Sequence, residues 1–92
     1  MPTAHRPQYI EFISRLRQAR KAKSITQTDL GERLNKPQSF ISKVETCERR
    51  LDLLEAAEWC LALGIKLDDV LPPEYRASLE AHYDDQPATE GQ

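Results

Sequence analysis

The spacing of apolar residues along the chain predicts a series of short amphipathic helices. Between residues 7 and 22 an apolar side chain recurs every three or four positions, which matches one face of an α-helix of about four turns. The residues on this face are Tyr9, Phe12, Ile13, Leu16 and Ala19. Pro7 suits the first position of such a helix, where its missing amide hydrogen breaks no intrahelical bond. No segment alternates apolar and polar residues with a period of two, so no β-strand is predicted.

A second, shorter helix is expected to begin in the segment "TQTDLGERL". Thr26 can accept a hydrogen bond from the amide three residues later, and Asp29 can reach back to the amide of Thr26, as in a capping box. Leu30 and Leu34 lie four residues apart and therefore face the same side, which we expect to be the core. Gly31 between them permits the close approach of a neighbouring helix.

The segment "NKP" separates this helix from a third one, "PQSFISKVE". A residue that precedes proline disfavours the α-helical conformation, so the second helix ends before Pro37, which opens the next helix. Ile41 and Val44 are the inward residues of that helix. Two helices joined by about four residues, each too short to be stable alone, are typical of a helix-turn-helix unit.

The fourth helix is expected between Asp52 and Gly64. Asp52 and Glu55 repeat the capping pattern, and Gly64 is a natural stop because glycine adopts the left-handed conformation without strain. The buried stripe of this helix is expected to comprise Leu53, Ala56 or Ala57, Cys60 and Leu63.

Beyond residue 64 the pattern predicts one short turn of helix in "IKLDDVL", ended by two prolines, and a sixth helix in "EYRASLEAHY". The prediction of the sixth helix depends on apolar residues spaced by fours, namely Leu71, Tyr75, Leu79 and Tyr83. Residues 84–92 are polar and acidic, a composition typical of a disordered tail.

Together these elements predict an all-α fold, a compact bundle of about five short helices with a C-terminal helical extension. We divide the chain into an N-terminal arm (residues 1–8), a helix-turn-helix domain (9–71), a C-terminal helix that could contact a second subunit (72–83) and a disordered acidic tail (84–92). A chain of 92 residues has room for a single modest core.

Charge is distributed unevenly along the chain, although the net charge is only −2. Residues 1–50 contain 11 Lys and Arg against 5 Asp and Glu and carry +6, whereas residues 51–92 contain 2 against 10 and carry −8. This asymmetry favours a basic face for a polyanion such as a nucleic acid. On its own it could also arise by chance in a small, highly charged protein.

Other functional classes find no support in the sequence. No apolar run is long enough to cross a bilayer and the N-terminus has no apolar signal segment, so we expect a cytoplasmic protein with no membrane partner. Cys47, Cys60, His5 and His82 have no companions at metal-binding spacing. No nucleophile–base pair or glycine-rich phosphate loop is present, so no catalytic residue, metal or cofactor is expected and an enzyme is disfavoured.

The exposed positions of the third helix suit contact with DNA bases. Glutamine can pair with adenine through two hydrogen bonds, lysine can reach the acceptors of guanine, and an aromatic edge can contact the thymine methyl group. The candidate base-contacting residues are Gln38, Ser39, Phe40, Ser42 and Lys43. A solvated helix face is the alternative for Gln38, Ser39 and Lys43, whereas for Phe40 it is packing in the core or on a neighbouring helix.

The segment "ITQTDLGERLNKPQSFISKVETCERRLDLLEAAEWCLALGIKLDDVL" resembles the Cro/cI-type (XRE, lambda-repressor-like) helix-turn-helix family. The resemblance covers about residues 12–71. It depends on Thr-Gln at the start of the second helix, on Leu30, on the Ser-x-x-Glu of "SKVE", on the basic "RR" that follows, and on Leu-Gly at the end of the fourth helix.

The resemblance implies DNA-contacting roles outside the third helix as well. Gln27 matches a glutamine that binds phosphate and supports the first base-reading side chain, and Arg20 matches an arginine that pairs with the equivalent of Glu45 near DNA. The loop after the third helix is implied to meet the sugar-phosphate chain. The phosphate-contacting candidates are Gln27, Arg20, Thr46, Arg49 and Arg50.

The chain departs from the family pattern at two positions. Gly31 replaces the usual alanine of the second helix. Cys47 replaces the usual glycine after the third helix, where a left-handed backbone would cost a non-glycine residue roughly 1 kcal/mol.

We therefore expect a sequence-specific DNA-binding transcriptional regulator, most simply a repressor, that binds the major groove of double-stranded DNA as a homodimer. The chain would be bacterial or phage-encoded and associated with the nucleoid when bound. The expected dimer contacts are Trp59, Leu61, Val70, Leu71, Tyr75 and Leu79. The C-terminal helix could instead fold back on its own domain. A second function also stays open, that of an antitoxin or adaptor whose main role is to bind a protein partner, such as a toxin or a co-regulator.

Overall fold

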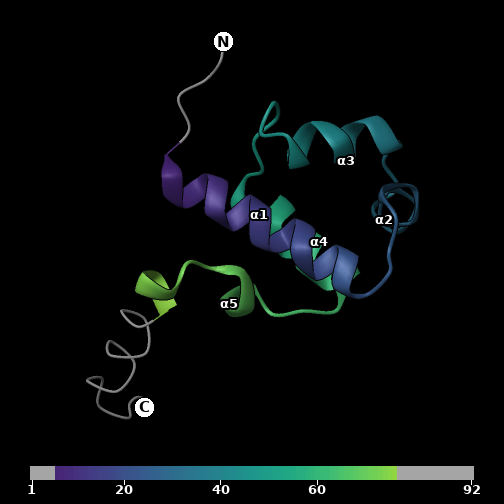
Figure 1. Cartoon of the computed structure of the whole chain (residues 1–92). Helices are drawn as coiled ribbons and strands as arrows, with labels where there is room; N and C mark the ends of the chain where they lie inside the picture. The colour runs from purple at the N-terminus through teal and green to yellow at the C-terminus, as the bar shows by residue number, and fades with distance from the viewer. Residues whose placement is uncertain (1–5, 77–92) are drawn as a thin grey trace, which may run out of the picture.

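The computed structural model describes residues 6–76, and within this range every regular element is a helix (Figure 1). The helices are α1 (Pro7–Ala22), α2 (Gln27–Leu34), α3 (Gln38–Glu45), α4 (Leu53–Leu63) and α5 (Leu67–Val70), and residues 73–76 are also helical. The predicted all-α fold is confirmed. The predictions that concern Leu79, Tyr83, the acidic tail and residues 1–5 lie outside the described residues.

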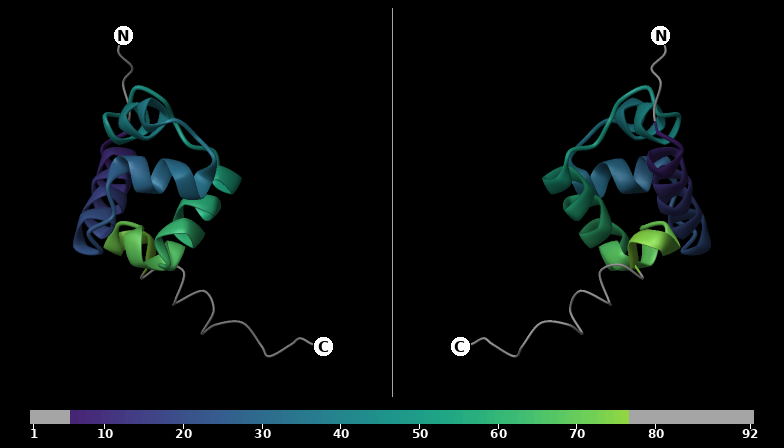
Figure 2. Two further views of the ribbon diagram at one scale, coloured as in Figure 1. Left: turned by 90° about the vertical axis from the view of Figure 1, so that its right-hand side faces the viewer. Right: turned by 90° about the vertical axis from the view of Figure 1, so that its left-hand side faces the viewer.

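The helices surround one core. Figure 2 shows α1 and α4 on opposite sides of the molecule, with α2 running between them, α3 across one end and α5 across the other. Each of these helices contributes at least one buried apolar side chain, so the core joins the helix-turn-helix pair to the rest of the domain. The buried cluster comprises Ile13, Leu16, Ile25, Leu30, Ile41, Val44, Leu51, Trp59, Cys60, Leu63 and Val70.

Both predicted capping boxes are present. At the start of α2, the Thr26 hydroxyl accepts a hydrogen bond from the Asp29 amide (3.0 Å), and the Asp29 carboxylate accepts one from the Thr26 amide (3.1 Å). These two hydrogen bonds lower the pKa of Asp29. At the start of α4, Asp52 and Glu55 exchange the same pair of bonds, at 2.7 and 3.0 Å. The helix starts are therefore encoded locally, because each cap satisfies amides that have no partner within the helix.

The capping glutamate of α4 also binds an arginine from the preceding loop. Arg49 donates two hydrogen bonds to the Glu55 carboxylate, at 2.6 and 2.9 Å. The Arg49 guanidinium, followed by the Asp52 amide, lowers the pKa of Glu55 from 4.5 to about 2. Glu55 therefore ties the α3–α4 loop to the first turn of α4.

The buried stripe of α4 differs from the predicted one. Ala56, Cys60 and Leu63 are buried as expected, but the fourth member is Trp59 instead of Leu53, which is 72% exposed. Steps of three and four residues from Ala56 reach Trp59 as readily as they reach Cys60. The Trp59 indole packs against the Phe40 ring of α3, and its large apolar surface gains more from burial than that of Leu53, so α4 is rotated from the predicted orientation to bury it.

This rotation corrects two of the expected dimer contacts. Trp59 and Val70 are 1% and 2% exposed, so both belong to the core of the protomer and cannot reach a second subunit. Leu61 is 80% exposed and stays available. Leu71 and Tyr75 are half-buried, and the Tyr75 hydroxyl accepts a hydrogen bond from Arg6 at 3.3 Å.

The turn between α2 and α3 brings two backbone segments unusually close together. Asn35 ends α2 in the left-handed conformation (φ 59°), and the Lys36 amide donates to the Gly31 carbonyl at 2.8 Å. A Cβ atom on Gly31 would lie 2.6 Å from the Lys36 carbonyl oxygen. The glycine in place of the usual alanine is therefore required by the path of the turn.

We expect Gly31→Ala to lower the free energy of unfolding by about 1–3 kcal/mol, because the new methyl group displaces backbone and not a flexible side chain. Urea unfolding followed by circular dichroism measures the change. Glu32→Ala, an exposed substitution on the same helix, should change stability by no more than about 0.5 kcal/mol. Helix propensity alone predicts the opposite sign for Gly31→Ala, so a stabilised variant would contradict the close contact.

We expect stability to fall as the pH decreases from 4.5 to about 2, because Glu55 is held ionised in the folded state and its contribution is lost on protonation. Glu55→Gln should lose this contribution at neutral pH and show a smaller pH dependence in that window. The difference should be roughly 1 kcal/mol, since solvent reaches part of the carboxylate. Unfolding midpoints at pH 2–7 test this, with Glu58→Gln as the control, because the exposed Glu58 carboxylate makes no ion pair or hydrogen bond within residues 6–76. An unchanged pH profile for Glu55→Gln would exclude the proposed linkage.

Candidate nucleic-acid interface

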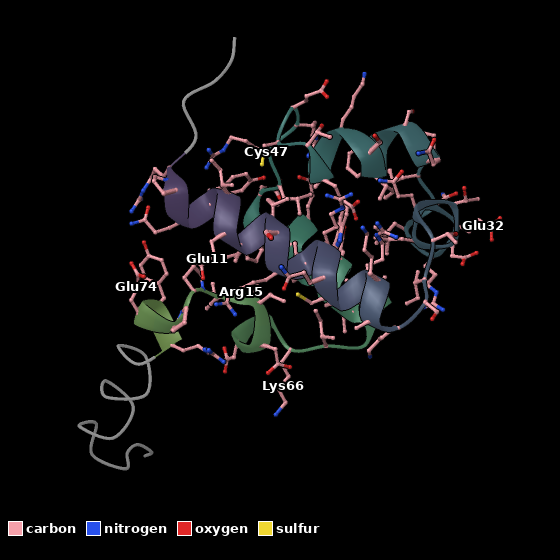
Figure 3. All side chains as sticks on the ribbon, in the orientation of Figure 1. Glu11, Arg15, Glu32, Cys47, Lys66 and Glu74 are labelled. Atoms are coloured by element: carbon pink, nitrogen blue, oxygen red, sulfur yellow. The ribbon has the colours of Figure 1, made fainter. Side chains whose placement is uncertain are left out.

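One side of α3 is packed into the core and the other is open. Ile41 and Val44 are fully buried, whereas Gln38, Ser39 and Lys43 are exposed. Figure 3 shows side chains extending from the side of α3 that faces away from α1. Gln38, Ser39 and Lys43 therefore lie on the open side of α3. Ser42 is half-buried and lies next to it.

A chain of hydrogen bonds fixes the side chain at the start of α3. The Gln38 amide nitrogen donates to the Gln27 Oε1 at 2.5 Å, and the Gln27 Nε2 donates to the Glu45 Oε1 at 2.9 Å. Glu45 also accepts from Arg20, through Nε at 2.6 Å and Nη2 at 3.0 Å. The Nη1 of Arg20 donates to the Ile25 carbonyl at 2.7 Å. The exposed tip of Gln38 is thus connected to α2, to the other end of α3 and to α1.

The Arg20–Glu45 pair at the centre of this chain is buried. Its side chains are 7% and 3% exposed, and the bidentate geometry gives both charges close partners. Arg20 therefore positions other residues and is not open to a phosphate, which corrects the role that the resemblance implied. The pairing of Arg20 with Glu45 itself agrees with that resemblance.

Phe40 belongs to the α3–α4 contact. Its ring lies 6.1 Å from the Trp59 ring, with an interplanar angle of 45°. The Lys36 ammonium and the Arg49 guanidinium lie 5.2 and 4.9 Å from its centroid. Phe40 and Val44 are one helical turn apart and share a side of α3, so the ring packs toward α4. Phe40 therefore packs on α4, as the packing alternative has it, and its half-buried ring is less accessible to bases than the exposed Gln38, Ser39 and Lys43.

The loop after α3 presents fewer free cations than expected. Arg49 is paired with Glu55, which raises the pKa of the arginine and offsets its charge. The Thr46 hydroxyl lies 2.8 Å from a Glu48 carboxylate oxygen and 3.2 Å from the Lys43 carbonyl. Arg50 is exposed and stacks on the Tyr9 ring at 4.5 Å. Of the three loop candidates, Arg50 is the arginine that is exposed, whereas Arg49 is half-buried against Glu55.

The loop keeps the left-handed conformation despite the replacement of glycine. Cys47 has φ 64°, and its amide donates to the Val44 carbonyl at 3.0 Å. Burial raises the pKa of the Cys47 thiol, so the group is less reactive than a free thiol. Cys47 therefore adopts the left-handed conformation that glycine adopts without strain, at a cost in backbone strain.

Sequence reasoning missed one cation next to the hydrogen-bonded chain. Arg17 on α1 has its Nε 3.8 Å from the Glu45 Oε1, and its side chain is 53% exposed. Because amphipathic spacing assigns Arg17 only to a solvated helix side, the sequence carries no signal of this contact.

Neither a metal-binding group nor a membrane-spanning helix is found in the part of the chain that the structure describes. No group of three or more His, Cys, Asp and Glu residues there could hold a metal ion. Among the same residues, no helix is both long and apolar enough to span a bilayer.

Comparisons with known proteins agree with this geometry. The family model HTH_3, described as helix-turn-helix, matches residues 16–70. An XRE-family like protein from Pseudomonas syringae pv. tomato str. DC3000 shares 39% identity, and the match covers 82% of this chain and 85% of that chain with a TM-score of 0.67. The restriction-modification controller protein C.AhdI from Aeromonas hydrophila shares 27% identity, covering 68% and 96% of the two chains with a TM-score of 0.63.

A more distant structure shares the fold. The clp gene regulator ClgR from C. glutamicum has 24% identity, with 88% of this chain and 97% of that chain covered and a TM-score of 0.65. No curated protein sequence matches the chain. The family match over more than half of the chain and the 39% identity lead to one conclusion. The chain belongs to the XRE helix-turn-helix family and is a DNA-binding transcription regulator, not an enzyme.

Proposed function

We propose that this regulator binds DNA sequence-specifically as a homodimer, with α3 of each protomer in the major groove, and that it represses transcription by occupying a promoter. The observation that carries the proposal is the hydrogen-bonded chain from Arg20 to Gln38. It holds a glutamine amide at the exposed start of α3, the part of a recognition helix that contacts base edges.

The proposed reading surface consists of three side chains on the open side of α3. Gln38 would pair with adenine, Lys43 would donate to guanine, and Ser39 can bind either base. Ser42 is half-buried and would contribute less. Because Gln38 uses one of its amide hydrogens on Gln27, its remaining amide hydrogen and its carbonyl oxygen are left to form the two bonds that adenine requires.

Backbone contacts are proposed at the edge of the same surface. The Thr26 hydroxyl caps only the Asp29 amide of α2. The two amides before it, those of Gln27 and Thr28, can therefore donate to a phosphate. Arg50 supplies an exposed cation from the loop after α3. Arg49 is left out of this set because Glu55 offsets its charge.

We expect the Gln38→Ala/Lys43→Ala double variant to lose about 1–3 kcal/mol of binding free energy per altered base contact on the preferred sequence, and far less on random DNA. Electrophoretic mobility shift measures the ratio of the affinity for a duplex selected from a random pool to the affinity for a random duplex of equal length. Lys66→Ala is the matched control, because Figure 3 shows Lys66 at the end of the molecule opposite α3. If the double variant kept the full ratio of selected to random affinity, α3 would not be the reading helix.

The proposed dimer surface is the outer side of α4. Leu53, Leu54 and Leu61 are 72%, 73% and 80% exposed, and Ala57 is exposed between them. Their spacing places them on one side of the helix, adjacent to the side that buries Ala56, Trp59 and Cys60 in the core. Large exposed leucines in such a group are typical of an interaction surface. Two-fold symmetry would place two reading helices about one turn of DNA apart, on a longer and more specific site.

We expect Leu54→Glu/Leu61→Glu to convert the protein from dimer to monomer in sedimentation velocity, because each substitution places a charge in the apolar contact. Binding to a two-half-site duplex should weaken, whereas binding to a single half-site should not. Ser14→Glu/Gln18→Glu adds the same charge at the same type of exposed helical position on α1 and should leave the mass unchanged. A wild-type protein that sediments as a monomer at micromolar concentration would contradict the homodimer.

The antitoxin or adaptor role remains the second candidate, because the same exposed leucines could bind a different protein. The two candidates differ in the state of the purified protein. A stable dimer with its α4 surface occupied favours the regulator that acts alone, whereas a monomer that binds DNA weakly favours the adaptor.

A further inference from the structure

Arg17 occupies an unusual place beside the buried Arg20–Glu45 pair. Its Nε lies 3.8 Å from the Glu45 Oε1, which is too long for a hydrogen bond, and its side chain is 53% exposed. The same oxygen already accepts hydrogen bonds from Arg20 and from Gln27, and the second oxygen accepts another from Arg20. Arg17 therefore forms a long ion pair with this carboxylate but no hydrogen bond to it.

The cluster of Arg17, Arg20 and Glu45 has a net charge of +1. Two arginines face one carboxylate, and Arg20 neutralises that carboxylate at 2.6 Å. Within residues 6–76 the guanidinium of Arg17 makes no hydrogen bond, so all of its donors remain available. A guanidinium in this state suits an anion with several acceptor oxygens, such as a phosphate.

The other arginines of α1 differ from Arg17 in this respect. Arg15 donates to Glu11 at 2.9 Å, one turn earlier on the same helix, and Arg20 is buried. Arg17 is the α1 arginine that combines an exposed side chain with a position near the Glu45 oxygen to which Gln27 donates. Since Gln27 is the first residue of α2 and holds Gln38, Arg17 lies at the edge of the proposed reading surface.

We propose that Arg17 binds a DNA backbone phosphate beside the start of α2, while Glu45 stays with Arg20 and Gln27. This inference rests on the proposed entry of α3 into the major groove. The phosphate would lie where the first amides of α2 and the exposed guanidinium of Arg17 both donate to it. The contact fixes the register of the protein on DNA and carries no base preference.

The test compares Arg17→Gln, Arg17→Lys and Arg15→Gln with the wild type, on the selected duplex and on a random duplex, at several salt concentrations. Arg17→Gln should weaken binding to both duplexes by a similar factor, of about tenfold per dimer near physiological salt. It should also reduce the slope of log affinity against log salt by about 2, one phosphate for each protomer. Arg17→Lys keeps the charge and should keep most of the slope. Arg15→Gln removes a paired arginine and should leave the slope unchanged.

Two outcomes would overturn the inference. If Arg17→Gln kept the wild-type slope, Arg17 would not contact a phosphate. If it reduced the ratio of selected to random affinity together with the free energy of unfolding, Arg17 would act by supporting Glu45. The Gln38→Ala/Lys43→Ala variant, run in parallel, separates this inference from the proposed function. If that variant loses the ratio of selected to random affinity while Arg17→Gln keeps the wild-type salt slope, only the role of Arg17 is excluded. If the wild type itself shows no sequence preference, the proposed function is excluded.

Discussion

The buried ion pair between Arg20 and Glu45 is the interaction on which the arrangement of the interface depends. Removing an arginine and a glutamate from water costs several kcal/mol per ion, and this cost is offset only when both groups have good partners. Here the carboxylate receives bonds from Arg20 and Gln27, and the guanidinium also donates to the Ile25 carbonyl. Each of these partners comes from a different part of the chain. The pair therefore holds α1, α2 and α3 in one geometry.

Local sequence signals predicted the boundaries of the helices well. Thr26 with Asp29 and Asp52 with Glu55 form the capping boxes, and Gly64 ends α4 in the left-handed conformation. These signals work because caps involve residues three positions apart, so nothing distant is needed to form them. The family resemblance added the Arg20–Glu45 pair, which joins residues 25 positions apart and which periodicity could not have found.

The sequence was less informative about which side of a helix is buried and about long side chains. Leu53 and Trp59 fit the periodicity of α4 equally well, and only the space beside α3 decides in favour of the indole. Arg49 reads as a free cation in a basic segment, yet it reaches Glu55 six residues later. Arg49 and the buried Arg20 are both neutralised by carboxylates. For this reason a count of basic residues overestimates the charge that is open to DNA.

The hydrogen bond between Gln27 and Gln38 has a consequence for the kinetics of recognition. A glutamine side chain on a free helix surface samples many rotamers, and immobilising it on binding costs roughly 0.5–1.5 kcal/mol. In this protein part of that freedom is already lost in the folded state, because the Gln38 amide donates a hydrogen bond to Gln27 of α2. Association with DNA should then resemble the docking of a rigid surface. The search for the correct register on DNA, and not a rearrangement of the Gln38 side chain, should limit the association rate.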